Sequence, residues 1–134
     1  MCEMYTQRLL AHYRPPRNKG LLEPPDAVRD SHQVVSSEEY NPRCGDRVTV
    51  QARIEAGRIV EARFDGRGWA LCLGAASILT EMIAGCTLKD LEELGQAEFL
   101  AELEARIRPS RLKCALLPWM AFRHAAFGEG EWSL

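Results

Sequence analysis

Two runs of alternating residues in the stretch RVTVQARIEAGRIVEARF, residues 47–64, decide the fold. The apolar members of these runs are Val48, Val50, Ala52 and Ile54, then Val60, Ala62 and Phe64. Alternation of apolar and polar residues is typical of a strand that buries one face. Ala56 and Gly57 lie between the runs, where a hairpin needs a tight turn. The stretch therefore predicts two antiparallel strands joined as a β-hairpin.

The segments on either side of the hairpin predict one more strand and several helices. Residues 4–13 have helical spacing of apolar residues, with Tyr5, Leu9 and Tyr13 on one face, and Val34 and Val35 begin a short strand. Residues 69–84 are apolar nearly all round, which is typical of a buried helix, and Gly85 ends it. Further helices are predicted over 87–94, over 96–107 and from Pro109 through Cys114 onward. We therefore expect a single α+β domain over residues 1–134, a small antiparallel sheet of about three strands packed with helices.

Composition narrows the classes of function. The 134 residues are 46% hydrophobic and 27% charged, as in a soluble domain with a sizeable core. The net charge of −2 gives no basic surface for nucleic acid. The longest nearly apolar run, residues 69–79, is too short to span a bilayer. Because no signal peptide is recognisable at the N-terminus, we expect a cytoplasmic protein without nucleic-acid or membrane partners.

The cysteines are the chemically informative residues. Their number, five, is odd, and without a secretory signal a disulfide framework is not expected. Cys44 and Asp46 flank Gly45, so a thiolate and a carboxylate can face one point if this turn curls. Zinc and ferrous iron accept such mixed ligands. The motif NPRCGD at 41–46 is also explained as a turn chosen for its backbone geometry, and the spacing alone leaves both interpretations open.

Four segments taken together carry a resemblance to a known family. They are AHYRPPRNKG at 11–20, NPRCGD at 41–46, FDGRGWALCLGAAS at 64–77 and RLKCALLPW at 111–119. In this order and spacing they resemble the U-type scaffold proteins of iron–sulfur cluster assembly, the NifU N-terminal, IscU and SufU group. The resemblance implies a SufE/NifU-like α+β fold. It also implies three cysteines and an aspartate that converge to bind zinc, iron or a transient cluster, with sulfur delivered by a cysteine desulfurase.

The resemblance assigns roles to individual positions. Cys44 and Cys114 match the first and last family cysteines, and Asp46 matches the family aspartate, so these three are the expected metal or cluster ligands. The middle cysteine of the family is replaced here by Trp69. Cys72, three residues further along, either substitutes as a ligand or is a buried, inert thiol; the pattern favours the buried thiol.

The expected function follows from the same resemblance. We expect a scaffold or sulfur acceptor, not an enzyme, with a cysteine desulfurase and apo iron–sulfur acceptor proteins as partners. Cys114 is the expected sulfur-accepting thiol, because Arg111 and Lys113 nearby are predicted to lower its pKa. The chain lacks the L-P-P-V-K segment and the histidine before the last cysteine, so it is more similar to the SufU-like branch, whose site holds zinc. Two rival functions stay open, a degenerate paralogue that binds no metal and serves as an interaction partner of the desulfurase, and a small zinc protein that regulates it.

Overall fold

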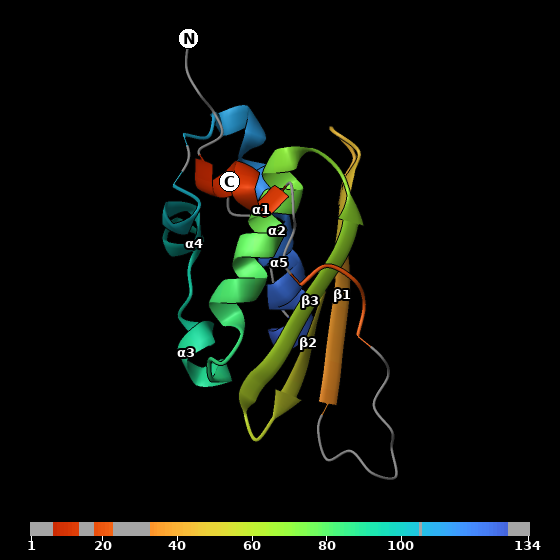
Figure 1. The fold of residues 1–134 in the computed structure, drawn as a ribbon, viewed down its shortest axis with the longest axis vertical. Helices are drawn as coiled ribbons and strands as arrows, with labels where there is room; N and C mark the ends of the chain where they lie inside the picture. Colours follow the sequence, from red (N-terminus) through yellow and green to blue (C-terminus); the bar gives the residue numbers. More distant parts are fainter. Residues whose placement is uncertain (1–6, 14–17, 23–32, 105, 129–134) are drawn as a thin grey trace.

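A three-stranded antiparallel sheet forms one layer of the molecule (Figure 1). The computed structural model describes residues 7–13, 18–22, 33–104 and 106–128. The strands are β1 (Gln33–Asn41), β2 (Asp46–Glu55) and β3 (Arg58–Arg67), and their order in the sheet is the order in the chain. The predicted hairpin is confirmed as β2–β3, and the strand expected at Val34 extends over nine residues as β1.

Helices form the second layer. Their bounds are α1 (Gln7–Tyr13), α2 (Ala70–Ile83), α3 (Leu88–Glu92), α4 (Gln96–Glu102) and α5 (Leu112–Phe127), with a short 3-10 helix η1 (Pro109–Arg111) before α5. Helices α2 and α5 pack against the sheet and against each other, and α1 packs on α2. Both α2 and α5 begin at the upper end of the sheet in Figure 1, where β1 ends and β2 begins. The α+β class predicted from the sequence is confirmed.

The register of the hairpin corrects one residue of the predicted pattern. A shift at Arg53/Ile54 pairs Ile54 with Ile59, while Ala52 pairs with Ala62. Ile59 is fully buried as a result, and Val60 is 45% exposed. The strict alternation that placed Val60 with Ala62 was therefore wrong, because an irregularity in a ladder moves the following side chains to the opposite face.

The helix predictions hold with shorter bounds. The buried helix is confirmed as α2, and Gly85 follows it with a left-handed φ of +87°. At α1, Leu9 is buried but Tyr13 is 38% exposed, and residues 4–6, including Tyr5, lie outside the described residues. The helix expected over 96–107 ends at Glu102.

Among the helices of the described residues, none combines the length and apolar character needed to cross a bilayer.

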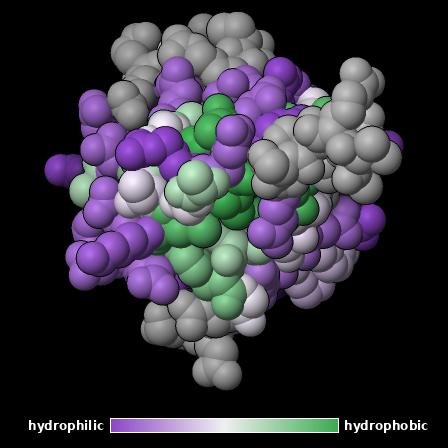
Figure 2. All heavy atoms as spheres, turned by 90° about the horizontal axis from the view of Figure 1, so that it is seen from below, coloured by the Kyte–Doolittle hydropathy of each residue, from purple (hydrophilic) through white to green (hydrophobic). Residues whose placement is uncertain are grey.

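The two ends of the molecule differ in what they expose. Figure 2 shows the end that carries the β2–β3 turn, where hydrophobic surface forms a central patch among hydrophilic side chains. The opposite end carries the β1–β2 turn and the starts of α2 and α5. The predicted ligands lie at this second end.

Candidate metal centre

The turn between β1 and β2 presents the first cysteine. Its backbone closes through a hydrogen bond from the Gly45 N–H to the Asn41 carbonyl, at 2.8 Å. Gly45 adopts a φ of +77°, a conformation that favours glycine. The side-chain oxygen of Asn41 accepts the Arg43 N–H at 3.1 Å, which holds the turn from inside. The interpretation of NPRCGD as a turn is therefore supported, and the same turn carries Cys44.

The loop between β3 and α2 fits around the carboxylate. Asp46 is fully buried, and its Oδ1 accepts the Trp69 backbone N–H at 3.0 Å, at the start of α2. A helix N-terminus stabilises an anion through its unpaired N–H groups and its dipole. A Cβ on Gly68 would lie 2.8 Å from the carboxyl carbon of Asp46, so only glycine permits this approach. The Oδ1 atom of Asp46 thus accepts a hydrogen bond at the start of α2, and its Oδ2 atom faces Cys44.

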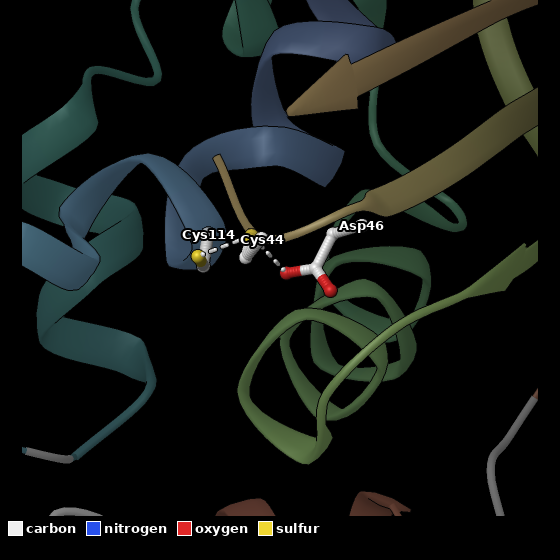
Figure 3. A group of neighbouring side chains, drawn as sticks. All are labelled: Cys44, Asp46 and Cys114. Carbon is white, nitrogen blue, oxygen red and sulfur yellow. Dashed lines mark hydrogen bonds between the residues drawn. The ribbon is translucent and has the colours of Figure 1, made fainter. Parts of the chain in front are cut away.

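The first turn of α5 brings the second cysteine to the same point. The Cys114 Sγ lies 3.1 Å from the Cys44 Sγ, and the Cys44 thiol donates to the Asp46 Oδ2 at 3.1 Å (Figure 3). The ligand atoms of Cys44, Asp46 and Cys114 all lie within 4.8 Å of one another. The three residues that the sequence predicts as ligands, separated by up to 70 positions, therefore meet at one site.

Trp69 and Arg111 stand at the mouth of this site. The Trp69 side chain is 57% exposed, and the Arg111 guanidinium lies over its ring, 5.9 Å from the centroid. A pocket of about 470 Å³ opens beside them and is lined by Asn41, Arg43, Cys44, Trp69, Ser110, Arg111 and Cys114. The indole thus occupies the rim and leaves the half-buried Cys44 accessible to solvent, whereas Cys114 behind it is 3% exposed.

The other described cysteines, Cys72 and Cys86, do not belong to the group of three ligand atoms. Cys72 is fully buried in α2 and does not belong to the group whose ligand atoms lie within 4.8 Å. Burial, and then the charge of Asp46, raise the pKa of the Cys72 thiol well above its ordinary value. Cys86 donates to the Met82 carbonyl at 3.2 Å, beyond the other end of α2. Cys2 lies outside the described residues.

The electrostatics of Cys114 correct the expectation of an activated thiol. Burial, followed by the hydrogen bond and charge of Cys44, raises the pKa of Cys114 from 9.0 to about 12. The expected lowering by nearby cations fails because the Arg111 guanidinium faces the Trp69 ring and Lys113 is exposed to solvent. Without a bound cation, the neutral thiol is the favoured form at pH 7.

The sequence analysis did not identify two residues, Asn41 and Gly68, as parts of the site. The side-chain amide of Asn41 donates to the Cys114 Sγ at 3.6 Å, and Asn41 is nearly fully buried. Gly68 makes room for the Asp46 carboxylate. Both residues stand inside the quoted motifs, but a turn residue and a glycine give no signal in the sequence that they contact a side chain far along the chain.

Fold and site together are those of a small α+β protein with a Cys–Asp–Cys cluster at one end of its sheet. The chain belongs to the family described as "NifU-like N terminal domain", which matches residues 4–128. It is 30% identical to "Zinc-dependent sulfurtransferase SufU" of Bacillus subtilis strain 168, over 94% of this chain and 91% of that protein. It is 28% identical to "Iron-sulfur cluster assembly scaffold protein IscU" of Escherichia coli K12, over 90% of each chain.

A solved structure supports the fold. The chain is similar to a putative iron–sulfur cluster assembly scaffold protein for the SUF system from Fervidobacterium islandicum AW-1, with a TM-score of 0.73 and 23% identity. The similarity covers 92% of this chain and 96% of that one. The predicted resemblance to the NifU, IscU and SufU group is therefore confirmed.

Proposed function

We propose that this protein works in iron–sulfur cluster assembly, holding zinc, iron or a transient cluster and accepting sulfur from a cysteine desulfurase in the cytoplasm. The observation that carries the proposal is the convergence of Cys44, Asp46 and Cys114 within 4.8 Å. The names of its relatives, a zinc-dependent sulfurtransferase and a cluster assembly scaffold, support it.

The donor set fits zinc. Tetrahedral zinc with bonds of about 2.3 Å places two thiolate sulfurs roughly 3.8 Å apart, and the two sulfurs here need only a small separation to reach that spacing. Asp46 offers Oδ2, while its Oδ1 remains on the helix. A bound zinc ion would hold both thiols deprotonated, which offsets the effect of their burial. Three protein ligands leave one position open, which suits exchange more than permanent retention.

Sulfur acceptance needs an accessible thiolate. We propose that the Cys114 thiolate attacks the terminal sulfur of the desulfurase persulfide, and that the desulfurase cysteine leaves as a thiolate. Cys114 is only 3% exposed and Cys44 is half-buried in front of it. The β1–β2 turn must therefore move aside, or Cys44 must take the sulfur first; single serine variants at the two positions separate these routes.

The protein acts in this proposal as a stoichiometric acceptor and scaffold, not as an enzyme. A chain that accepts one sulfur and passes it to apo iron–sulfur proteins is compatible with the word sulfurtransferase in the name of the Bacillus subtilis relative. The rival function, a partner of the desulfurase that binds no metal, is favoured by Trp69 at the place of a family ligand. The convergence of the other three groups argues against it.

Metal analysis of untagged protein tests the proposal. We expect about one equivalent of zinc or iron per chain, lost in Cys44→Ser and in Cys114→Ser and retained in Cys86→Ser, whose thiol bonds to Met82 instead. Cys72→Ala tests the remaining candidate, and we expect it to retain the metal. Metal-free wild-type protein that still raises desulfurase turnover would instead support the rival function.

A further inference from the structure

The two cysteines of the site are arranged as a reactive pair. Their sulfurs lie 3.1 Å apart and neither is in a disulfide. A disulfide needs about 2.05 Å between sulfurs, so closing one here requires a shift of roughly 1 Å. Cys44 lies on the short turn between β1 and β2, while Cys114 is fixed in the first turn of α5. The disulfide therefore needs only a small movement of the Cys44 side of the pair.

Among the described cysteines, Cys44 and Cys114 are the pair whose sulfurs are in direct contact. Cys72 is fully buried in α2 and outside the group of three ligand atoms, although Asp46, Cys114 and Cys44 are near enough to raise its pKa beyond the effect of burial. Cys86 lies beyond the far end of α2. The Cys44 S–H donates to Asp46, which leaves the lone pairs of its sulfur free to face Cys114. The geometry therefore favours the formation of a disulfide between Cys44 and Cys114.

We propose that Cys44 and Cys114 are an accepting and resolving pair, in which a sulfur accepted on Cys114 is released as sulfide when Cys44 forms a disulfide with it. This inference rests on the proposed sulfur-acceptor function. The Cys44 sulfur attacks the Cys114 Sγ, the bond from that Sγ to the terminal sulfur breaks, and the terminal sulfur leaves as HS⁻. The proton of Cys44 passes to solvent, which reaches this half-buried thiol. The terminal sulfur is reduced by two electrons and the two thiols are oxidised; a dithiol reductant resets the pair.

Metal binding and this reaction exclude each other. A ligand thiolate cannot be part of a disulfide and coordinate an ion at the same time, so sulfide release belongs to the metal-free protein. A scaffold that holds its metal with three cysteines has several possible pairings among its ligands, whereas the described ligand group here contains two thiols. With Trp69 in place of a third thiol, Cys44 and Cys114 are left as the pair that forms the disulfide.

The test uses the reduced, metal-free full chain and glutathione persulfide as the sulfur donor, and it is followed to completion because the raised pKa of Cys114 slows the reaction of its thiol. For wild type and Cys86→Ser we expect about one sulfide per chain above a protein-free control, together with a Cys44–Cys114 disulfide mapped by mass spectrometry. In Cys44→Ser and Cys44→Ala we expect Cys114 to retain the mass of one added sulfur, with sulfide release about tenfold lower. Prior loading with zinc should suppress disulfide formation in wild type.

The outcomes separate this inference from the proposed function. Wild-type protein that keeps the added sulfur without forming a disulfide overturns the resolving role and leaves the acceptor function intact. Diamide, a thiol oxidant that carries no sulfur, tests the geometry alone; failure to form the Cys44–Cys114 disulfide with it also overturns the inference. If no variant gains sulfur and wild type forms no disulfide with the persulfide, the acceptor function fails and the inference fails with it.

Discussion

At the scale of single residues, Trp69 sets this site apart. Its backbone N–H donates to Asp46, so the position is part of the site whatever side chain it carries. Its indole is exposed beside the cysteines and stacks with Arg111. The Trp69 side chain therefore lies at the rim of the cluster. A cysteine at this position, with its shorter side chain, could point its thiol toward Cys44 and Cys114.

Trp69→Cys should strengthen metal binding. A fourth protein ligand would close the coordination shell, and we expect the zinc Kd to fall roughly tenfold or more. Competition with a chromophoric chelator measures this. Trp69→Ser is the matched control, because it removes the indole without adding a thiolate and should leave the Kd nearly unchanged. Equal affinities for the two variants would mean that position 69 does not face the ion.

Two substitutions of Asp46 should distinguish its contribution to stability from its contribution to metal binding. Asp46→Asn keeps an oxygen that accepts the Trp69 N–H, so we expect the free energy of unfolding of the metal-free protein to change little. Asp46→Ala removes the acceptor from the helix start and should cost about 1 to 2 kcal/mol. Both variants should bind zinc more weakly. Chemical denaturation and zinc titration of the two variants measure these effects, and equal stabilities would contradict the role of Oδ1 at the helix.

The thiol of Cys114 should react slowly in the metal-free protein. Its pKa, raised from 9.0 to about 12, lowers the thiolate fraction at pH 7.5 by roughly a thousandfold relative to an ordinary cysteine. Alkylation by iodoacetamide, followed at Cys114 by mass spectrometry, should therefore accelerate as the pH rises from 9 to 12. The same residue in urea-unfolded protein is the control and should react with a midpoint near pH 9.

The raised pKa of Cys114 also makes the free energy of unfolding depend on pH. A thiol kept neutral by folding contributes stability below pH 9, and this contribution is lost as the pH rises towards 12. The free energy of unfolding should fall over that range, and fall less in Cys114→Ala.

At the scale of elements, the site is made by three chain segments that approach one another closely. Gly68 lies between β3 and α2 and contacts Asp46 at the start of β2. Gly66 packs in the same way against the backbone carbonyl of Arg47 in the adjacent strand. Glycines thus bring the β3–α2 loop against β2, and the start of α2 onto the carboxylate.

Gly68→Ala should destabilise the protein and disturb the site together. Its Cβ would overlap the Asp46 carboxylate, and we expect a loss of about 1 to 3 kcal/mol in the free energy of unfolding and weaker zinc binding. Gly95→Ala is a control for space, since its Cβ meets nothing closer than 3.7 Å, and it should cost only about 0.5 to 1 kcal/mol because alanine is a poorer N-cap for α4. Thermal melts and zinc titration of both variants measure the difference, and a Gly68→Ala protein with native stability would rule out the overlap.

The elements also show what could be read from the sequence. Periodicity identified the hairpin and α2, because burial of one face or of the whole surface leaves a pattern in the residues themselves. It failed at Val60, since the register shift at Arg53/Ile54 depends on how two strands pair and not on either strand alone. The ligand set came from family resemblance. The raised pKa of Cys114 and the contact from Asn41 could not be foreseen, because both depend on packing across the fold.

At the scale of the whole molecule, the charges are unevenly distributed. Residues 81–104 contain seven acidic residues and one lysine. At the end with the cysteines, the site pocket is lined by Arg43 and Arg111 and by no acidic residue among those the structure describes. A second pocket of about 730 Å³ on the sheet is lined by Arg47 and Arg67 together with Glu38 and Asp65. Within the described part of the chain, these four arginines form no ion pair. The pocket beside the cysteines therefore presents a positive face, while the second pocket is balanced.

This positive face predicts an electrostatic component in partner binding. The proposed cysteine desulfurase should offer acidic groups around its persulfide, because like charges would oppose approach and opposite charges steer it. Arg43→Gln and Arg111→Gln should each weaken association about three- to tenfold at low salt, mainly through the association rate, and the differences should shrink above about 0.5 M salt. Arg63→Gln is the control, since Arg63 already pairs with Glu61 on the sheet, 2.9 Å away. Surface plasmon resonance against the desulfurase over a salt series measures the rates. An affinity independent of salt, or equal losses in all three variants, would show that these arginines do not guide the partner to Cys44 and Cys114.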